Sequence, residues 1–305
     1  MKSMIYYLIR CKVIGGLIMA ENSSCASASS CSRGSCEGCP SHEATKAGVR
    51  NTSFLEAPNP NSNIKHVIGV VSGKGGVGKS MVTSSLAGVM ARAGYKVGIL
   101  DADITGPSIP KMFGVHGPAA ASAEGMMLPE VAEDGTKIMS INLILDDEES
   151  PVVWRGPVIA GVVKQFWTDV VWGDIDYLFV DMPPGTGDVP LTCFQSLPVD
   201  GIVIVTSPQE LVQMIVKKAY NMADMMHIPV VGLVENYSYI KCPDCGKKIE
   251  IFGESHIDEV AAELNLPVIG KLPMDRKFAT AADAGRIFDV ENEYLESVKG
   301  VLESL

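Results

Sequence analysis

The chain has 305 residues, of which 47% are hydrophobic, and it carries a formal net charge of -11 at pH 7. This length and apolar content suffice for a substantial buried core, in one large domain or two small ones. The acidic balance argues against a nucleic-acid partner, because phosphate backbones are bound by clustered Lys and Arg, and the densest basic cluster here is Lys247 and Lys248 with Lys241 nearby.

The first 63 residues are predicted to lie outside the folded domain. Residues 1–18 are apolar, but Arg10 and Lys12 divide them into pieces too short for a membrane span or a signal peptide, so we expect an upstream start codon and an ordinary start at Met19. Residues 19–63 are rich in Ser, Ala, Gly and Cys, which predicts a flexible segment and linker. Without export we expect a cytoplasmic, reducing location, where the eight cysteines are metal ligands or free thiols and not disulfides.

From residue 64 onward, short apolar runs alternate with helix-length segments. This alternation predicts one α/β domain over residues 64–305, with a mostly parallel sheet and helices on both faces. Strands are expected over residues 67–71, 97–100, 138–141, 177–180, 202–206, 230–235 and 267–270. Helices are expected over residues 81–93, 161–171, 210–226, 256–264 and 292–305.

Residues 73–80 read GKGGVGKS, which matches the phosphate-binding pattern GxxxxGK[ST]. Its glycines let backbone N–H groups approach phosphate oxygens, Lys79 reaches the terminal phosphates, and the Ser80 hydroxyl binds Mg²⁺. The loop lies between a predicted strand and a predicted helix, whose N-terminus favours anions. We therefore predict a three-layer P-loop NTPase. The predicted nucleotide-binding residues here are Gly73, Lys74, Gly75, Gly76, Val77, Gly78, Lys79, Ser80 and Met81.

The loop contains a second lysine, Lys74, ahead of Lys79. A flexible ammonium in the first turn cannot easily reach its own nucleotide while Lys79 holds the phosphates, so Lys74 is expected to point outward. The loop resembles the deviant Walker A motif of the MinD, ParA and nitrogenase iron-protein class, in which this lysine contacts the partner subunit's nucleotide. That resemblance implies a nucleotide-bridged homodimer. The alternative is a solvated surface lysine.

Two further segments place carboxylates where a P-loop enzyme needs them. The second predicted strand leads into DADITGPS, and the strand over 177–180 ends in Asp181, within YLFVDMPPGTGD. Ligand groups gather at the carboxyl ends of parallel strands. In the resembling ATPases the second aspartate of DxD, here Asp103, orients or deprotonates the attacking water. Asp181 can hold Mg²⁺ beside the loop, and the glycines after it let the backbone approach the γ-phosphate as a switch. The predicted catalytic residues are Lys74, Lys79 and Asp103.

The nucleotide is expected to be ATP. In the resembling class the asparagine that corresponds to Asn236 hydrogen-bonds the adenine, and the Asn-Lys-x-Asp pattern common in GTPases is absent here. The alternative is that Asn236 is a simple turn residue.

A pair of cysteines follows, in the sequence Cys242-Pro-Asp-Cys245-Gly. Two thiolates at this spacing can bind one metal from a tight turn, but no second CxxC completes a Cys₄ site. Two copies of the pair, facing each other at the two-fold axis of a dimer, would supply four thiolates and suit a [4Fe-4S] cluster. A structural zinc remains the alternative, because thiolates bind both.

Six motifs occur in the order found in the Mrp-type iron–sulfur carrier ATPases, a family that includes bacterial ApbC and the eukaryotic cytosolic cluster scaffolds. They are VSGKGGVGKS, DADITGPSIPKMFG, VVWRGP, DYLFVDMPPGTGD, VENYSY and CPDCG, and the resemblance covers residues 64–285. It implies ATP-dependent assembly of a [4Fe-4S] cluster and its transfer to apo iron–sulfur proteins, with slow ATP hydrolysis and with Cys242 and Cys245 binding the bridging cluster.

Other members of the superfamily offer rival functions. A positioning ATPase of the MinD or ParA kind would need a basic DNA-binding face or a basic amphipathic membrane helix, whereas the C-terminal segment has Glu293, Glu296 and Glu303 against Lys299. We therefore expect neither nucleic acid nor membrane as a partner. A nitrogenase-like reductase would bridge its cluster from well-separated cysteines and not from CxxC.

Four more cysteines, Cys25, Cys31, Cys36 and Cys39, have the spacing C-x5-C-x4-C-x2-C. This departs from the C-x13-C-x2-C-x5-C motif of the eukaryotic relatives. The four thiolates could wrap a second [4Fe-4S] cluster, bind zinc, or remain unligated. Cys193 is expected to be buried on a helix and unrelated to these sites.

Overall fold

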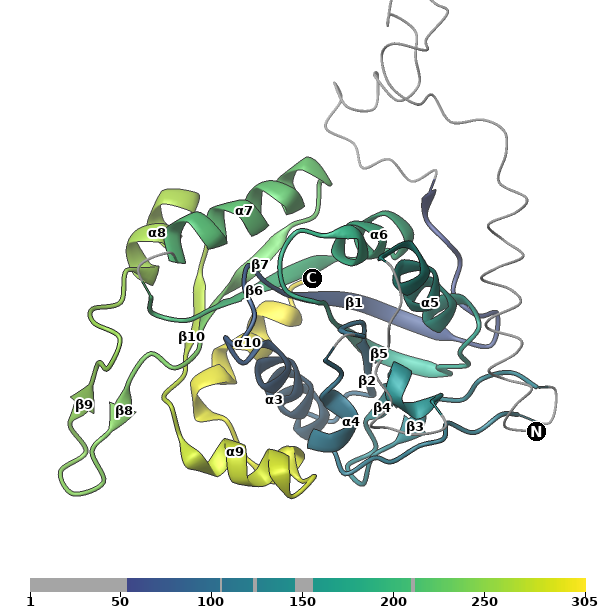
Figure 1. Ribbon diagram of the computed structural model, residues 1–305, viewed down its shortest axis with the longest axis horizontal. Helices are drawn as coiled ribbons and strands as arrows, with labels where there is room; N and C mark the ends of the chain where they lie inside the picture. Colours follow the sequence, from purple (N-terminus) through teal and green to yellow (C-terminus); the bar gives the residue numbers. More distant parts are fainter. Residues whose placement is uncertain (1–53, 105, 123–124, 146–155, 210–211) are drawn as a thin grey trace, which may run out of the picture.

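The computed structural model describes residues 54–104, 106–122, 125–145, 156–209 and 212–305, and a sheet of eight strands forms its centre (Figure 1). The strand order is β10-β7-β6-β1-β5-β2-β4-β3, and neighbouring strands are parallel except for the antiparallel pair β3 and β4. The strands are β1 (Asn63–Ser72), β2 (Val97–Asp101), β3 (Glu130–Val131), β4 (Lys137–Met139), β5 (Asp174–Asp181), β6 (Gly201–Thr206), β7 (Val230–Glu235) and β10 (Val268–Lys271).

Helices cover both faces of this sheet, which gives three layers (Figure 1). One face carries α5 (Gly156–Thr168), α6 (Asp188–Ser196), α7 (Val212–Met225) and α8 (Ile257–Leu264). The other carries α3 (Lys79–Arg92), α4 (Ile109–Met112), α9 (Arg276–Asp283) and α10 (Glu296–Leu302). Three short 3-10 helices, η2 (Ile141–Leu143), η3 (Ile287–Asp289) and η4 (Glu293–Leu295), complete the connections.

The alternation of side chains along the strands creates two separate cores. In β6, Ile202 and Ile204 pack with α5 to α8, whereas Val203 and Val205 pack on the opposite side with α3 and α10. All four are fully buried. Because full burial of such a side chain contributes about 1.5–3 kcal/mol, a charged substitution on either face of β6 would destabilise the whole domain.

The sheet order brings the predicted site together. β1 lies between β6 and β5, and β5 pairs with β2 so that Asp181 lies opposite Asp101. The carboxyl ends of these parallel strands therefore meet at one edge of the sheet, and the P-loop leaves β1 at that edge.

The predicted α/β P-loop fold is confirmed for the described residues, with corrections to individual elements. The strand expected over 138–141 ends at Met139, because the chain turns into η2. The helix expected from residue 161 begins at Gly156, and the last one begins as η4 before α10. Two helices were not predicted at all. They are α4 and α9, each of eight residues or fewer, whereas α6 is the helix on which Cys193 was expected.

The N-terminal predictions lie outside the described residues. These are the upstream start at residues 1–18, the flexible segment and linker of residues 19–63 as far as residue 53, and the four cysteines Cys25, Cys31, Cys36 and Cys39, whereas residue 63 of that linker begins β1.

Candidate functional site

The P-loop connects the end of β1 to the start of α3. Gly76 and Gly78 have φ values of 79° and 75°, in the left-handed region that glycine tolerates best. Gly78 is the N-cap of α3, and no side chain caps this helix end. The loop therefore presents the backbone N–H groups and the positive end of α3 to an anion.

Lys79 begins α3 and is only 6% exposed. Its Nζ lies 2.8 Å from Asp181 Oδ2 and 3.7 Å from Asp103 Oδ2. Among the described residues it forms these ion pairs but no hydrogen bond. A buried ammonium with unused protons is suited to phosphate oxygens, as the sequence predicts for this lysine.

Asp181, at the end of β5, is fully buried and accepts two short hydrogen bonds from α3. Ser80 Oγ donates to Oδ2 at 2.6 Å, and Thr83 Oγ1 donates to Oδ1 at 2.6 Å. A hydroxyl and a carboxylate at this separation are hard oxygen donors that fit Mg²⁺. Thr83 was not predicted from the sequence, although its position three residues after Ser80 places it on the same helix face.

Asp101 is the last residue of β2 and lies opposite Asp181, and Asp103 lies in the loop that follows β2. Asp101 is fully buried, and it accepts hydrogen bonds from the Asp103 backbone N–H at 3.2 Å and from Ser140 Oγ at 3.1 Å. Burial, and next the negative charge of Asp181, raise the pKa of Asp101 to about 8, with Lys79 opposing them. Asp101 thus shapes the loop that presents Asp103, a role that the sequence analysis did not assign.

The segment after Asp181 lies against the P-loop, as expected of a switch. Gly185 has φ 89°, and its N–H donates to the Ser72 carbonyl at 2.7 Å. A Cβ at Gly75 would lie 3.9 Å from Pro184. A shift of the segment after Asp181 would therefore displace the P-loop, and the reverse.

The other predicted loop residues have packing roles that fix the loop. Val77 is buried, and Met81 is half-buried in the first turn of α3. A Cβ at Gly73 would collide with Ile215 of α7, so this position requires glycine.

Lys74 does not contact the carboxylates at the carboxyl ends of β2 and β5. Its Nζ donates to the side-chain oxygen of Gln209, in the loop that follows β6. Gln209 was not predicted, since nothing in its local sequence indicates a contact with residue 74.

Asn236 follows β7 and lies directly beneath the P-loop. Its Nδ2 donates to the Val77 carbonyl at 2.9 Å, and the side chain is fully buried. Its Oδ1 has no hydrogen-bond partner among the described residues. A Cβ at Gly78 would collide with Nδ2 and would lie 2.8 Å from Tyr237 Oη, so glycine is required there too.

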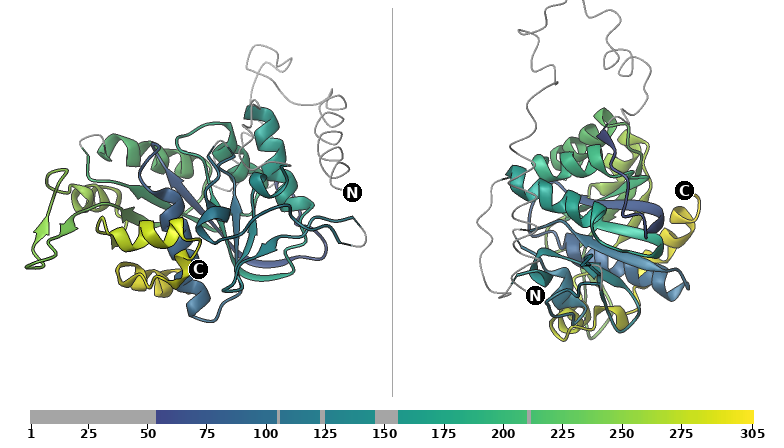
Figure 2. Two further views of the ribbon diagram at one scale, coloured as in Figure 1. Left: turned by 60° about the horizontal axis from the view of Figure 1, so that its bottom comes forward. Right: turned by 90° about the vertical axis from the view of Figure 1, so that its right-hand side faces the viewer.

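Cys242 and Cys245 lie in the turn between β8 (Ile240–Lys241) and β9 (Lys248–Ile249), a hairpin that extends from the body of the protein (Figures 1 and 2). The Cys242 N–H donates to the Lys247 carbonyl, and the Gly246 N–H donates to the Cys242 carbonyl, each at 2.9 Å. Cys245 is exposed and Cys242 is half-buried. The sequence analysis did not predict this hairpin, because each strand has only two residues.

The turn favours the thiolate form of one cysteine. The backbone N–H groups of Cys245 and Asp244, and then the Cys245 thiol, lower the pKa of Cys242. Within the described ranges, no third Cys, His, Asp or Glu joins the pair in a metal-binding cluster. In the described part of the chain, this turn thus brings two thiols together.

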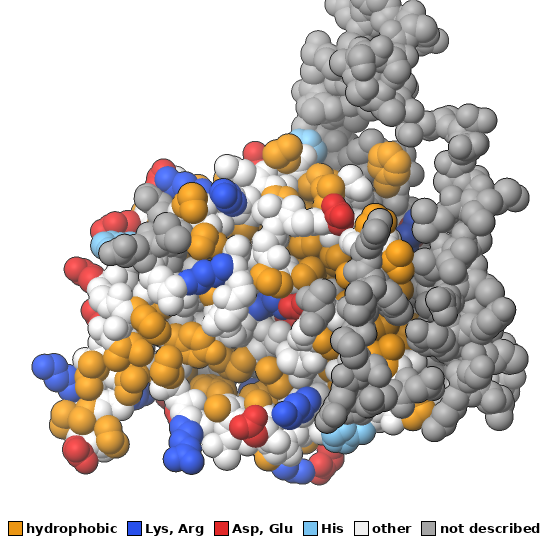
Figure 3. All heavy atoms as spheres, in the orientation of Figure 1, with side chains coloured by type: hydrophobic (Ala, Val, Ile, Leu, Met, Phe, Trp, Pro, Cys, Tyr) orange, Lys and Arg blue, Asp and Glu red, His pale blue; other side chains and the backbone are white. Residues whose placement is uncertain are grey.

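The hairpin region also exposes large apolar side chains. Hydrophobic side chains gather over it in the space-filling view (Figure 3), and they include the exposed Ile249, Ile251 and Phe252. Cys193, in contrast, is fully buried on α6, as predicted, and burial raises the pKa of its thiol to about 12.

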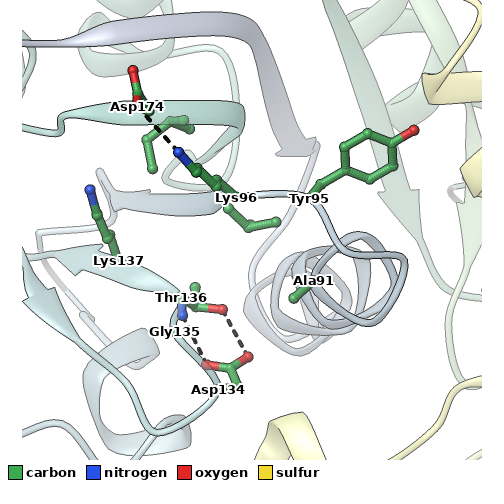
Figure 4. A pocket seen from close by; sticks show the side chains of 10 residues that line it. Ala91, Tyr95, Lys96, Asp134, Gly135, Thr136, Lys137 and Asp174 are labelled. Atoms are coloured by element: carbon green, nitrogen blue, oxygen red, sulfur yellow. Dashed lines mark hydrogen bonds and ion pairs between the residues drawn. The ribbon is translucent and has the colours of Figure 1, made fainter.

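A hollow of ≈ 390 Å³ lies at the opposite edge of the sheet (Figure 4). Lys96, Lys137 and Asp174 line it, at the amino ends of β2, β4 and β5. Because these strands are parallel, this edge is remote from the P-loop. Lys96 pairs with Asp174 at 3.3 Å, and Lys137 donates to the Trp172 carbonyl, so these charges already have protein partners.

A family model described as the NUBPL iron-transfer P-loop NTPase, of the ParA type, matches residues 63–305. The chain belongs to this family. The predicted resemblance is thereby confirmed. None of the helices in the described ranges has the length and hydropathy needed to span a bilayer.

Individual relatives agree with the family. The iron-sulfur cluster carrier protein of Methanocaldococcus jannaschii is 46% identical over 256 residues, covering 83% of this chain and 88% of its own. The protein of the same name from Clostridium perfringens is 45% identical over 276 residues, covering 88% and 93%.

Solved structures give the same fold. A nucleotide-binding protein from Archaeoglobus fulgidus, in complex with ADP, is 43% identical with a TM-score of 0.69, covering 76% of this chain and 91% of that one. The cell division ATPase MinD of Pyrococcus furiosus, 17% identical with a TM-score of 0.54, shares the fold over 78% of this chain and 97% of its own.

Proposed function

We propose that this chain is an ATP-dependent iron–sulfur cluster carrier. Two copies hold one [4Fe-4S] cluster between Cys242 and Cys245 of each copy and transfer it to apo-proteins, with slow ATP hydrolysis. The main support is the exposed CPDCG turn, on the hairpin that follows β7. The chain is also 45–46% identical to two proteins named iron-sulfur cluster carriers.

The surroundings of Asn236 support adenine as the base. Its Nδ2 is already used on the Val77 carbonyl, whereas Oδ1 has no partner among the described residues. Because this side chain is fully buried, it would have to shift on nucleotide binding so that Oδ1 accepts a hydrogen bond from the amino group of adenine. The carbonyl oxygen of guanine at the same place would bring two acceptors together, so we propose ATP and not GTP.

The phosphates of ATP would lie over the α3 N-terminus and Lys79. Ser80 and Asp181 would hold Mg²⁺, which neutralises charge on the terminal phosphates when bound. Asp103, whose Oδ2 lies 3.7 Å from Lys79 Nζ, would orient or deprotonate the attacking water.

The dimer is proposed to close around the nucleotides. In that state Lys74 leaves Gln209 and contacts the nucleotide of the partner copy, as in the deviant Walker A class that its loop resembles. The two hairpins then bring four thiolates to the two-fold axis. Hydrolysis would relax the Asp103 and Asp181 loops, so that the cysteine turns release the cluster to a recipient.

Two further parts of the proposal concern the rest of the chain. We place the protein in the cytoplasm, because a reducing compartment keeps Cys242 and Cys245 available as thiolates. The N-terminal cysteines are proposed as a second, separate cluster site in the same chain. These cysteines are Cys25, Cys31, Cys36 and Cys39.

Anaerobic reconstitution of the full-length protein tests this function. Iron and sulfide are counted, and the thiolate-to-iron absorbance is recorded, for the wild type, for Cys242→Ala and for Cys245→Ala. Each variant should lose the bridging cluster, whereas Cys193→Ala, the buried control, should retain it. Replacing the four N-terminal cysteines by Ser should lower the iron content without removing the bridging cluster. Unchanged iron in Cys242→Ala, or zinc in place of iron, would refute the proposed function.

A further inference from the structure

The two ends of the cysteine hairpin meet at one buried carboxylate. Glu235, the last residue of β7, is fully buried. Its Oε2 accepts a hydrogen bond from Ser238 Oγ at 2.7 Å, and its Oε1 accepts one from Ser255 Oγ at 2.8 Å. Ser238 precedes β8 and Ser255 follows β9. One side chain thus joins both legs of the hairpin that carries the cysteines.

The same strand end is in contact with the P-loop. Asn236, the residue after Glu235, donates from Nδ2 to the Val77 carbonyl at 2.9 Å and from its backbone N–H to the Thr206 carbonyl at 2.8 Å. Nδ2 is so close to Gly78 that a Cβ there would collide with it. The P-loop cannot shift at Val77 and Gly78 without displacing Asn236 or breaking this bond.

The hydrogen bonds of Glu235 indicate that it holds the two legs of the hairpin together and is not a simple packing residue. A buried carboxylate is costly unless it is well hydrogen-bonded, and no cation of the described residues pairs with this one. Its hydrogen-bond donors are the two hydroxyls, one from each leg of the hairpin. A carboxylate offers two equivalent acceptors in one rigid plane, which suits holding both legs at a fixed separation.

Other contacts of the hairpin join it to segments near the C-terminus of the chain and not to the P-loop. The Met274 N–H donates to the Tyr239 carbonyl at 2.8 Å, and Lys241 Nζ donates to Tyr294 Oη at 2.6 Å. These contacts hold the hairpin against the segment before α9 and against η4. The Glu235 contacts differ because Glu235 directly precedes Asn236, which donates a hydrogen bond to the Val77 carbonyl of the P-loop.

We propose that Glu235 is a positioning residue that transmits the state of the P-loop to Cys242 and Cys245. A nucleotide that moves the Val77 carbonyl shifts Asn236, the Glu235 carboxylate moves with it, and both legs of the hairpin follow. The access and separation of the two thiols then depend on the nucleotide. This inference rests on the proposed function in one respect, namely that nucleotide binds at the P-loop.

The test measures thiol access in the metal-free, full-length protein. The rate of iodoacetamide alkylation at each cysteine is followed by mass spectrometry, with and without the non-hydrolysable analogue AMPPNP and Mg²⁺. In the wild type, nucleotide should change the rate at Cys242 and Cys245 about 5-fold or more, the lower bound of typical coupling between sites. Buried Cys193 is the internal reference and should not respond.

Three variants isolate the role of Glu235. In Glu235→Ala, the rates with and without nucleotide should become equal within about 2-fold, although AMPPNP binding persists. Glu235→Gln, whose amide can still pair with both hydroxyls, should restore most of the response. Ser255→Ala, which releases one leg only, gives a second measurement should Glu235→Ala fail to fold, and it should reduce the response. Ser297→Ala, which removes a hydroxyl-to-carbonyl bond on α10, is the matched control.

Each outcome has a definite meaning. A full nucleotide response in Glu235→Ala or in Ser255→Ala overturns this inference and leaves the proposed function intact. A wild type that binds AMPPNP without any change at the cysteines also overturns it. Failure of the wild type to bind nucleotide overturns both the inference and the proposed function. Iron counts address the proposed function alone.

Discussion

Replacing Asp101 by Asn is predicted to stabilise the nucleotide-free protein above about pH 5. The Asp101 carboxyl is fully buried, and its residue lies opposite Asp181 in the pairing of β2 with β5. Burial and the charge of Asp181 raise its pKa from the ordinary value of 3.8 to about 8, and Lys79 opposes this only in part. The folded protein therefore keeps a proton that the unfolded chain releases.

The sign and the size of the effect follow from this difference. Below about pH 4 the carboxyl is protonated in both states and contributes no pH dependence. Between about pH 4 and pH 8 the unfolded chain binds fewer protons, so the free energy of unfolding falls by up to about 1.4 kcal/mol per pH unit. From pH 5.5 to 7.5 this amounts to about 3 kcal/mol. The amide introduced by Asp101→Asn cannot ionise, although it can accept from the Asp103 N–H and donate to Ser140 Oγ.

The assay is urea unfolding followed by circular dichroism at pH 5.5, 6.5 and 7.5, in EDTA and without nucleotide. The stability of Asp101→Asn relative to wild type should rise by about 3 kcal/mol across this range, since the contributions of groups that do not interact with Asp101 cancel in the difference. Asp224→Asn, an exposed change on α7, should follow the wild-type profile. A difference between Asp101→Asn and wild type that stays constant with pH would refute the reasoning.

Two further predictions concern the P-loop and the cysteines. Gly76→Ala and Gly78→Ala both place alanine at positive φ, which should lower the free energy of unfolding by about 1–2 kcal/mol. Only at Gly78 would the new Cβ also collide with Asn236. Urea unfolding should therefore show a loss for Gly78→Ala that is about 1 kcal/mol larger than for Gly76→Ala. Equal losses would show that the contact with Asn236 is unimportant. For the thiols, the pH midpoint of Cys242 alkylation should lie below that of an unperturbed cysteine, because hydrogen bonds lower its pKa, while buried Cys193 should remain unmodified in the native protein. Ready alkylation of native Cys193 would contradict the buried position on α6.

The parts of the site that the sequence predicts are those written in short, contiguous motifs. Lys79 and Ser80 could be assigned from the GxxxxGK[ST] pattern, and Asp103 and Asp181 because they lie at or just after the carboxyl ends of parallel strands, which meet at one edge of the sheet. The geometry then places all four within one network. The turn that holds Cys242 and Cys245 was also predicted, because two cysteines at this spacing can share one tight turn without any other part of the chain.

The parts that were missed depend on contacts between distant segments. Thr83 and Asp181 are 98 residues apart, and Ser255 meets Glu235 across 20 residues that include the whole hairpin. No local pattern predicts such pairs, because the meeting of two polar side chains is decided by strand order and register. The contact of Gln209 with Lys74 is of the same kind.

The central claim is that two chains share one cluster through the CPDCG turns. Native mass spectrometry of the anaerobically reconstituted protein, with the four N-terminal cysteines replaced by Ser and with AMPPNP and Mg²⁺ present, tests it most directly. The account predicts a species of two chains with a single [4Fe-4S] cluster, and its absence when Cys242→Ala and Cys245→Ala are combined. Single chains that each carry their own metal, or a dimer that contains zinc or no metal, would contradict it.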